Sequence, residues 1–153
     1  MKMTMKVDGL REIDAALGQF TKATAKGVLR RVGRDALEPM ADAARSLAPD
    51  DPETPDPDLE SSITIGTRLN KRQASMAKRD EGKAFVTVYM GTNDPAGVQQ
   101  EFGNENHGPQ PFMRPAFDQH AQGTIKRVAE GLGDEITKTA KRVAARAAKK
   151  AAQ

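Results

Sequence analysis

The sequence predicts an α+β fold, in which a small antiparallel sheet packs against two or three helices and the last helix is long. Apolar residues from Thr24 to Leu47 recur every three or four positions, as on one face of a helix. Residues 83–91 are rich in β-branched and aromatic side chains, as in a strand. A second helical stripe runs from Phe117 nearly to the C-terminus. The length is typical of one domain, spanning residues 1–153.

The first twenty residues predict a short strand followed by a helix. Met3, Met5 and Val7 alternate with polar residues, which is typical of a half-buried strand. The helix that follows has Asp8 as a candidate N-cap. Its apolar stripe consists of Leu10, Ile13, Leu17 and Phe20.

The next predicted helix, residues 24–47, has the most regular apolar spacing in this half of the chain. Ala48-Pro49 ends it, because a residue that precedes proline disfavours the helical conformation. Residues 50–58 contain only Asp, Glu, Pro and Thr, so we expect an exposed acidic loop there.

Two strands joined by a basic segment are expected in the middle of the chain. Ile63 and Ile65 alternate with polar residues, as in a strand. Basic and small polar residues predict an exposed loop over residues 68–82. The strand at residues 83–91 is apolar on both faces, so we expect it at the centre of the sheet.

Residues 99–118 predict a bend ahead of the last helix. Gly103 and Gly108 permit positive φ angles there. Pro115 is predicted to be the first helical residue, where its missing N–H group is not needed. The last helix then covers residues 115–151 and exceeds about 45 Å at about 1.5 Å per residue. That is longer than a thin domain can cover.

Arg114 places a positive charge at the start of this helix, which is unfavourable unless a carboxylate neutralises it. Asp118, one turn further on, or an acid from another subunit would serve, and a simple exposed arginine is an equally open alternative. Phe112, Met113 and Phe117 are expected to form an apolar cluster around Arg114.

The composition argues against catalysis. The chain has no cysteine, which excludes disulfides, thiolate metal sites and thiol nucleophiles. His107 and His120 are a poor metal pair without cysteine nearby. Glu101 with His107 is a conceivable acid–base pair, but polar loop residues satisfied by water or backbone explain the same pattern. We therefore expect no enzyme, no metal and no cofactor.

Charge and hydropathy point to a protein that assembles with others and has no membrane partner. No apolar run approaches the roughly 20 residues of a membrane span, and the N-terminus lacks the apolar core of a signal peptide. Aromatic residues are only 4% of the chain, so the core is expected to be thin and to depend on neighbouring subunits. Acidic residues gather at 50–60 and basic residues at 138–150, which favours oriented docking.

Two nearby segments resemble the tail-component family of lambdoid siphophages: Glu101-Phe102-Gly103, and Gln110-Pro111-Phe112-Met113-Arg114-Pro115-Ala116-Phe117. The resemblance extends to the order of elements over most of the chain. It includes a Gly-Leu-Arg-Glu helix start, the Ala48-Pro49 helix end and the strand entry at residues 59–63. The chain departs from the family just before that strand, where it has Asp56-Pro57-Asp58 in place of a Thr-Gly turn.

The resemblance implies a structural virion protein, a tail-completion or head-to-tail joining subunit that is assembled in the host cytoplasm. Several copies are expected to form a ring, a hexamer, between the neck and the tail tube. The implied partners are sister copies and other neck and tail proteins, such as a tail terminator, stopper or adaptor. Inter-subunit contacts are expected at Phe112, Met113, Arg114 and Phe117. A basic loop that faces the lumen or a partner is expected at Arg68, Lys71 and Arg72.

A DNA-binding protein that uses its basic C-terminal helix is the alternative function. DNA passing through a channel would also attract either basic stretch without base readout. Neither stretch carries aromatic residues for base stacking, which argues against RNA or single-stranded DNA as a ligand. A small hydrolase, resting on Glu101 and His107 alone, is a third possibility.

Overall fold

The computed structural model of the chain describes residues 10–49, 59–69, 71–76 and 86–151. It is mostly helical, with a two-stranded antiparallel sheet and a long C-terminal helix, which confirms the predicted α+β class. In chain order the elements are α1 (Leu10–Gly18), α2 (Lys22–Leu47), α3 (Leu59–Ser62), β1 (Ile63–Gly66), α4 (Lys71–Met76), β2 (Tyr89–Thr92), α5 (Ala96–Phe102) and α6 (Met113–Ala151).

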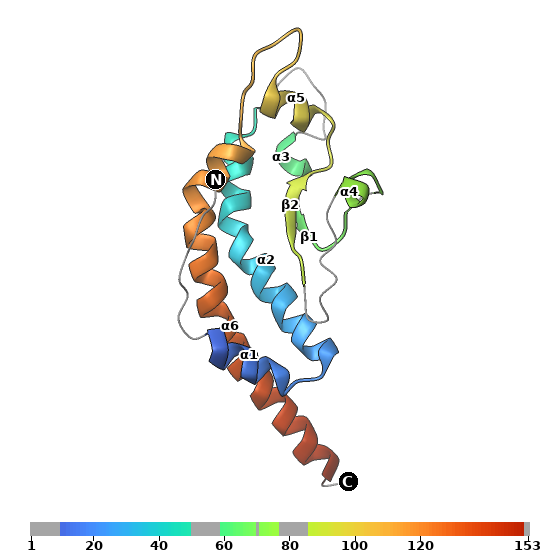
Figure 1. The fold of residues 1–153 in the computed structure, drawn as a ribbon, viewed down its shortest axis with the longest axis vertical. Coiled ribbons are helices and arrows are strands. Elements are labelled where there is room, and N and C mark those ends of the chain that lie inside the picture. Colours follow the sequence, from blue (N-terminus) through green and yellow to red (C-terminus); the bar gives the residue numbers. More distant parts are fainter. Residues whose placement is uncertain (1–9, 50–58, 70, 77–85, 152–153) are drawn as a thin grey trace.

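The framework of the molecule is the antiparallel pair of α2 and α6, which lie side by side (Figure 1). Thr21 begins α2, because its extended backbone lets the side-chain oxygen accept a hydrogen bond from the N–H group of Thr24 at 3.3 Å. The helix continues through Pro39 and ends before Ala48. Its bounds therefore agree within two residues with the predicted helix at residues 24–47.

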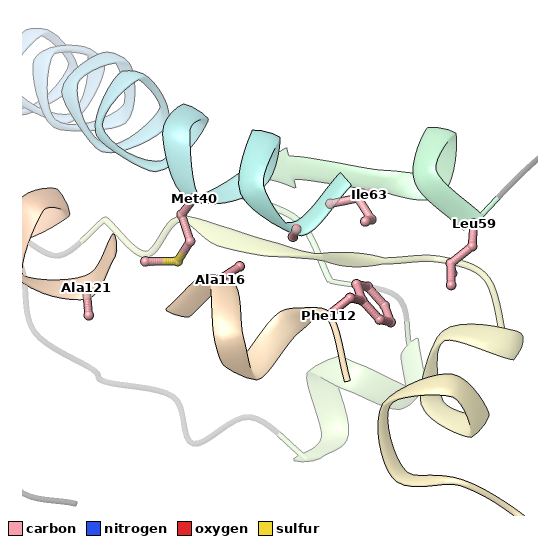
Figure 2. Packing of buried hydrophobic residues seen from close by; sticks show 7 residues of the cluster. Met40, Leu59, Ile63, Phe112, Ala116 and Ala121 are labelled. Carbon is pink, nitrogen blue, oxygen red and sulfur yellow. The ribbon is translucent and has the colours of Figure 1, made fainter. Parts of the chain in front are cut away.

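Two apolar clusters hold this pair together. The first joins α2, α3, β1 and α6 and contains the fully buried ring of Phe112, which lies near Leu59 and Ile63 (Figure 2). The second joins α1 to α2 and α6 around Val28 and Leu132. Helices α2 and α6 approach closely there, since a Cβ atom on Gly131 would lie 3.2 Å from Cγ1 of Val32. The core is thus divided between the two ends of α2.

The sheet pairs Ile63 with Thr92 and Ile65 with Met90. The strand expected at residues 83–91 forms only over Tyr89–Thr92 in the described part of the chain, where β2 has β1 as its one neighbour. The expected central position is therefore wrong for the described residues. Apolar side chains of β2 instead line two hollows: Met90 lines a groove with α2 and α6, and both Met90 and Tyr89 line a hollow with β1 and α4.

The structure bears on some of the other predicted segments and not on others. Residues 71–76, expected within a basic loop, form the short helix α4. The short helix α5 lies just ahead of the predicted bend and includes its first residues. The strand expected near Met5 and the acidic loop at residues 50–58 lie outside the described residues. None of the described helices combines the length and apolarity needed to cross a membrane.

The last helix begins two residues earlier than predicted and leaves its far end uncovered. Met113, not Pro115, is its first helical residue. Thr139 is the last buried residue of α6, and every residue from 140 to 150 is exposed. In Figure 1 this final stretch continues beyond α1 and the N-terminal end of α2. We call residues 140–150 the arm.

Candidate assembly site

Close packing and a short turn fix α5 against the sheet. A Cβ atom on Gly97 would lie 2.3 Å from Cγ2 of Thr92, so only glycine lets α5 approach β2 this closely. Asp94 accepts a hydrogen bond from the N–H group of Ala96 at 2.8 Å, while its own N–H group donates to the Thr92 hydroxyl. These contacts hold α5 where its last residues can meet the start of α6.

Gly103 turns the chain back from α5 toward α6. Its φ angle is +78°, a conformation that favours glycine, and its N–H group donates to the carbonyl of Gln99 at 2.7 Å. A Cβ atom there would also lie 2.9 Å from the nitrogen of Pro109. The returning chain is tied to α5 where the N–H group of Gln110 donates to the carbonyl of Gln100 at 2.7 Å. Gly103 therefore adopts the positive φ angle that a glycine was expected to permit there.

The carboxylate of Glu101 is the N-terminal cap of α6. It accepts hydrogen bonds from the N–H groups of Phe112, Met113 and Arg114 at 2.9, 2.9 and 3.1 Å. The first main-chain bond at this end runs from the N–H group of Ala116 to the carbonyl of Phe112. Four earlier N–H positions therefore lack a helical acceptor. Glu101 serves three of them, and Pro115 at the fourth has no N–H group to satisfy.

Arg114 completes the cap by binding the same residue. Its Nε donates to Oε1 of Glu101 at 2.8 Å, and its Nη2 donates to the main-chain carbonyl of Glu101 at 2.6 Å. The guanidinium also lies over the ring of Phe102, 5.1 Å from the ring centre. The carboxylate that binds Arg114 is therefore Glu101 of the same chain. It is none of the alternatives that the sequence left open, which were Asp118, an acid from another subunit and a simple exposed arginine.

Burial and binding act on the Glu101 carboxyl in opposite directions. Only 5% of the residue is exposed, and this desolvation raises the pKa of the carboxyl. The hydrogen bonds from the Arg114 side chain and from the three N–H groups lower it, and together they prevail. The pKa of Glu101 therefore lies below its ordinary value, and the group is a carboxylate at neutral pH.

The four residues predicted at an inter-subunit contact have different environments. Phe112 is fully buried in its own chain and anchors the start of α6. Met113 is half-buried against the same cluster. Arg114 is exposed apart from its bonds to Glu101. Phe117 has 52% of its surface exposed, so it is the apolar member of the set that a neighbouring molecule could cover.

Phe117 borders an apolar groove of about 670 Å³ between α2, β2 and α6. Arg114 and Asp118 stand at the same groove, and Arg114 separates it from Phe102, which is 66% exposed. The hydroxyl oxygen of Thr124 in this groove is buried, and no described residue forms a hydrogen bond with it. The larger apolar side chains that line the groove are Leu37, Met40, Val88, Met90, Met113, Phe117 and Ile125. Sequence patterns do not predict this groove, because its walls come from three separate segments.

The described part of the predicted basic loop, residues 68, 69 and 71–76, does not line this groove. Arg68 is exposed and lines a separate hollow of about 410 Å³ beside β1 and β2. Lys71 is exposed at the start of α4, and Arg72 follows it in the same helix. Their role toward a lumen or a partner stays a prediction.

Glu101 and His107 are not arranged as an acid–base pair. Both are described, and no hydrogen bond joins their side chains, since the Glu101 oxygens are bound by α6. The Nδ1 atom of His107 instead lies 2.9 Å from the carbonyl oxygen of Gly108. Over the described ranges, no three His, Cys, Asp or Glu side chains are grouped as metal ligands.

Glu101 is the residue whose role the sequence analysis did not find. A signal was present, because a cation at the first turn of a helix calls for an acid. The acid, however, lies thirteen residues before Arg114, and only the turn at Gly103 brings the two together.

Comparisons of this chain with family models, with curated proteins and with solved structures found no match.

Proposed function

We propose that the chain is a structural virion protein of a long-tailed bacteriophage, a tail-completion subunit that joins head to tail. In this proposal several copies form a ring, six being the expected number, between the neck and the tail tube. The ring contacts other neck and tail proteins, such as a tail terminator, stopper or adaptor. The phage assignment is based on the sequence resemblance, and the assembly surface is based on the geometry described above.

One observation carries the proposal: the two segments that resemble the tail-component family form a single structural unit. Glu101 of the first segment caps the helix that the second segment begins, and Arg114 of the second binds Glu101 in return. Residues of a shared motif that lie apart in sequence are thereby joined by direct contacts. The unit exposes Phe102 from the first segment and Phe117 from the second.

The exposed rings and the apolar groove are suited to contact with a second copy. Single exposed apolar residues are common, but here the exposed ring of Phe117 borders a groove of about 670 Å³. Arg114 borders the same groove and lies over the exposed ring of Phe102. A ring closes when one surface of each copy binds a different surface of the next.

The test is the mass of the purified protein in solution, measured by light scattering after size-exclusion chromatography, alone and with purified tail tubes. We expect an oligomer that binds tail tubes. The double variant Phe102→Ser, Phe117→Ser should be monomeric and should not bind them. Leu47→Ser is the matched control, because Leu47 is also a partly exposed apolar residue but does not line the groove, and it should behave as the wild type.

Two results would contradict this proposal. A wild-type protein that is monomeric at every concentration and ignores tail tubes excludes a ring subunit. A double variant that still assembles as the wild type does places the interface elsewhere and removes the structural support from Phe102 and Phe117.

A further inference from the structure

The arm is a helix that the rest of the described chain does not cover. All of its residues are exposed, and Val143, at 45% exposed, is its one apolar side chain larger than alanine. The segment remains helical because alanine, lysine and arginine are strong helix formers and the arm continues an existing helix. Lys149 and Lys150 in the last turn also favour the helix by facing its negative end.

The arm carries positive charge on one side. No acidic residue follows Glu135 in the sequence. At about 100° per residue, the cations of the arm fall on one half of the helix circumference together with Ala145, and the other alanines and Val143 occupy the other half. The arm's cations are Lys141, Arg142, Arg146, Lys149 and Lys150. They are spread over about 14 Å of helix axis.

The base of the arm is fixed to the body of the molecule. Glu135 accepts a hydrogen bond from Nε of Arg31 on α2 at 2.9 Å and another from Nη2 of Arg142 at 2.7 Å. Arg142 is therefore engaged by an acid of its own chain. The other four cations of the arm form no ion pair with any described residue.

We propose that the arm binds the phosphate backbone of double-stranded DNA without reading its sequence. This inference goes beyond the assembly role and does not depend on it. A duplex presents about one negative charge per 1.7 Å of axis. The arm is about 14 Å long, so the duplex offers a phosphate to each of its four unpaired cations. On the cationic side only the small side chain of Ala145 lies between the cations, so the helix can approach the backbone closely.

Duplex DNA suits the arm better than an acidic protein or a single strand does. Exposed ion pairs between proteins contribute little, and the arm has almost no apolar surface to add to them. Binding to DNA is driven instead by the release of counterions, which needs cations alone. Single strands are bound largely through aromatic stacking, and the arm contains no aromatic residue.

The test is the binding of full-length protein to two fluorescent DNA duplexes of unrelated sequence, followed by anisotropy as salt rises from about 50 to 200 mM. Four phosphate contacts predict that affinity falls by at least about 150-fold over this range, equally for both sequences. Replacing Lys141, Arg146, Lys149 and Lys150 with Gln should abolish this binding. The matched control replaces Arg11, Lys22, Arg30 and Arg34, exposed cations outside the arm, with Gln and should retain it.

Circular dichroism of both quadruple variants establishes that α6 remains helical. The proposal is overturned if the wild type does not bind, if its affinity is insensitive to salt, or if it prefers one sequence. It is also overturned if both quadruple variants lose affinity equally, because net charge alone then explains binding. Displacement of the duplex by poly-glutamate at equal charge concentration would instead identify the arm as a site for acidic proteins.

Discussion

Arg114 donates hydrogen bonds to both the side-chain and the main-chain oxygen of Glu101, so a residue at the start of α6 holds the last turn of α5 twice. The carboxylate at the centre of this contact is buried, while the guanidinium is mostly exposed. The pair differs in this respect from an ordinary surface ion pair, which contributes at most about 1 kcal/mol. Its contribution comes from the helix N–H groups that Glu101 also satisfies.

Glu101→Gln should lower the free energy of unfolding by about 2 kcal/mol. An amide offers one acceptor oxygen, and its NH₂ group would face N–H donors where the second carboxylate oxygen now accepts. Chemical denaturation followed by circular dichroism measures the change. Glu105→Gln is the control, because Glu105 is exposed, and it should have almost no effect. Equal effects of the two variants would show that the cap contributes nothing specific.

Stability should decrease in acid because of Glu101 and Glu135. The pKa of each carboxyl lies below its ordinary value of 4.5 in the folded protein. For Glu135, burial raises the pKa and the bonds from Arg31 and Arg142 lower it further than that. Between the folded and unfolded pKa values the unfolded chain binds more protons, so this stability is present above about 4.5 and is lost as pH falls through the folded pKa.

The pH dependence of Glu101→Gln provides the test. Denaturation curves at pH values from about 7 to 3 should show a smaller loss of stability below about pH 4.5 in this variant than in the wild type. Glu105→Gln should retain the wild-type slope. An unchanged slope in Glu101→Gln would mean that this carboxyl does not have a lowered pKa.

Gly103→Ala should destabilise the protein by about 1–2 kcal/mol. The φ angle of +78° strains any residue with a Cβ atom, and that atom would lie 2.9 Å from the nitrogen of Pro109. Gly108→Ala in the same loop is the matched control, since nothing lies within 4 Å of its added Cβ atom. Thermal unfolding should separate the two variants, and equal midpoints would refute the strain argument.

Phe112→Ala and Phe117→Ala should affect stability very differently. Phe112 is fully buried, and removing such a ring costs about 3–5 kcal/mol. Phe117 is half exposed, so its loss should change the unfolding free energy of the isolated chain by less than about 1 kcal/mol. Denaturation at low protein concentration measures both. A large loss at Phe117 would show that the ring supports the fold as well as the proposed interface.

Gly133→Ala should stabilise the protein by about 0.5–1 kcal/mol, because alanine favours a helix over glycine and nothing obstructs the new methyl group. Gly131→Ala is the informative comparison, since its methyl group would meet Val32 at 3.2 Å. It should stabilise less than Gly133→Ala does in the same thermal unfolding experiment. The reverse order would show that α2 and α6 are not tightly packed at Gly131.

The regular parts of the fold could be predicted from local patterns. The spacing of Val28, Val32 and Met40 locates α2 to within two residues, because a helix that buries one face repeats its apolar residues at its own period. The strand β1, which contains Ile63 and Ile65, also follows from the local alternation of apolar and polar residues. Such patterns record which residues face a core, and the helices and strands follow from that alone.

The site could be predicted only in part, because its contacts join distant segments. Proline favours the first helical position, and this preference placed the helix start at Pro115. Glu101 instead satisfies the N–H groups of three earlier residues, so the helix begins at Met113. The groove beside Phe117 likewise needs α2 and β2 to form its walls. Local sequence contains neither contact.

The capped N-terminus of α6 also makes the two ends of this helix differ in their attraction for anions. A helix normally attracts anions to its amino-terminal end through free main-chain donors. Here those donors already have an internal carboxylate, and a proline fills the remaining position, so that end has no main-chain group left for an incoming anion. Cations concentrate at the opposite terminus of the same helix. An anionic surface would therefore contact the arm first, and every copy would attach in the same orientation.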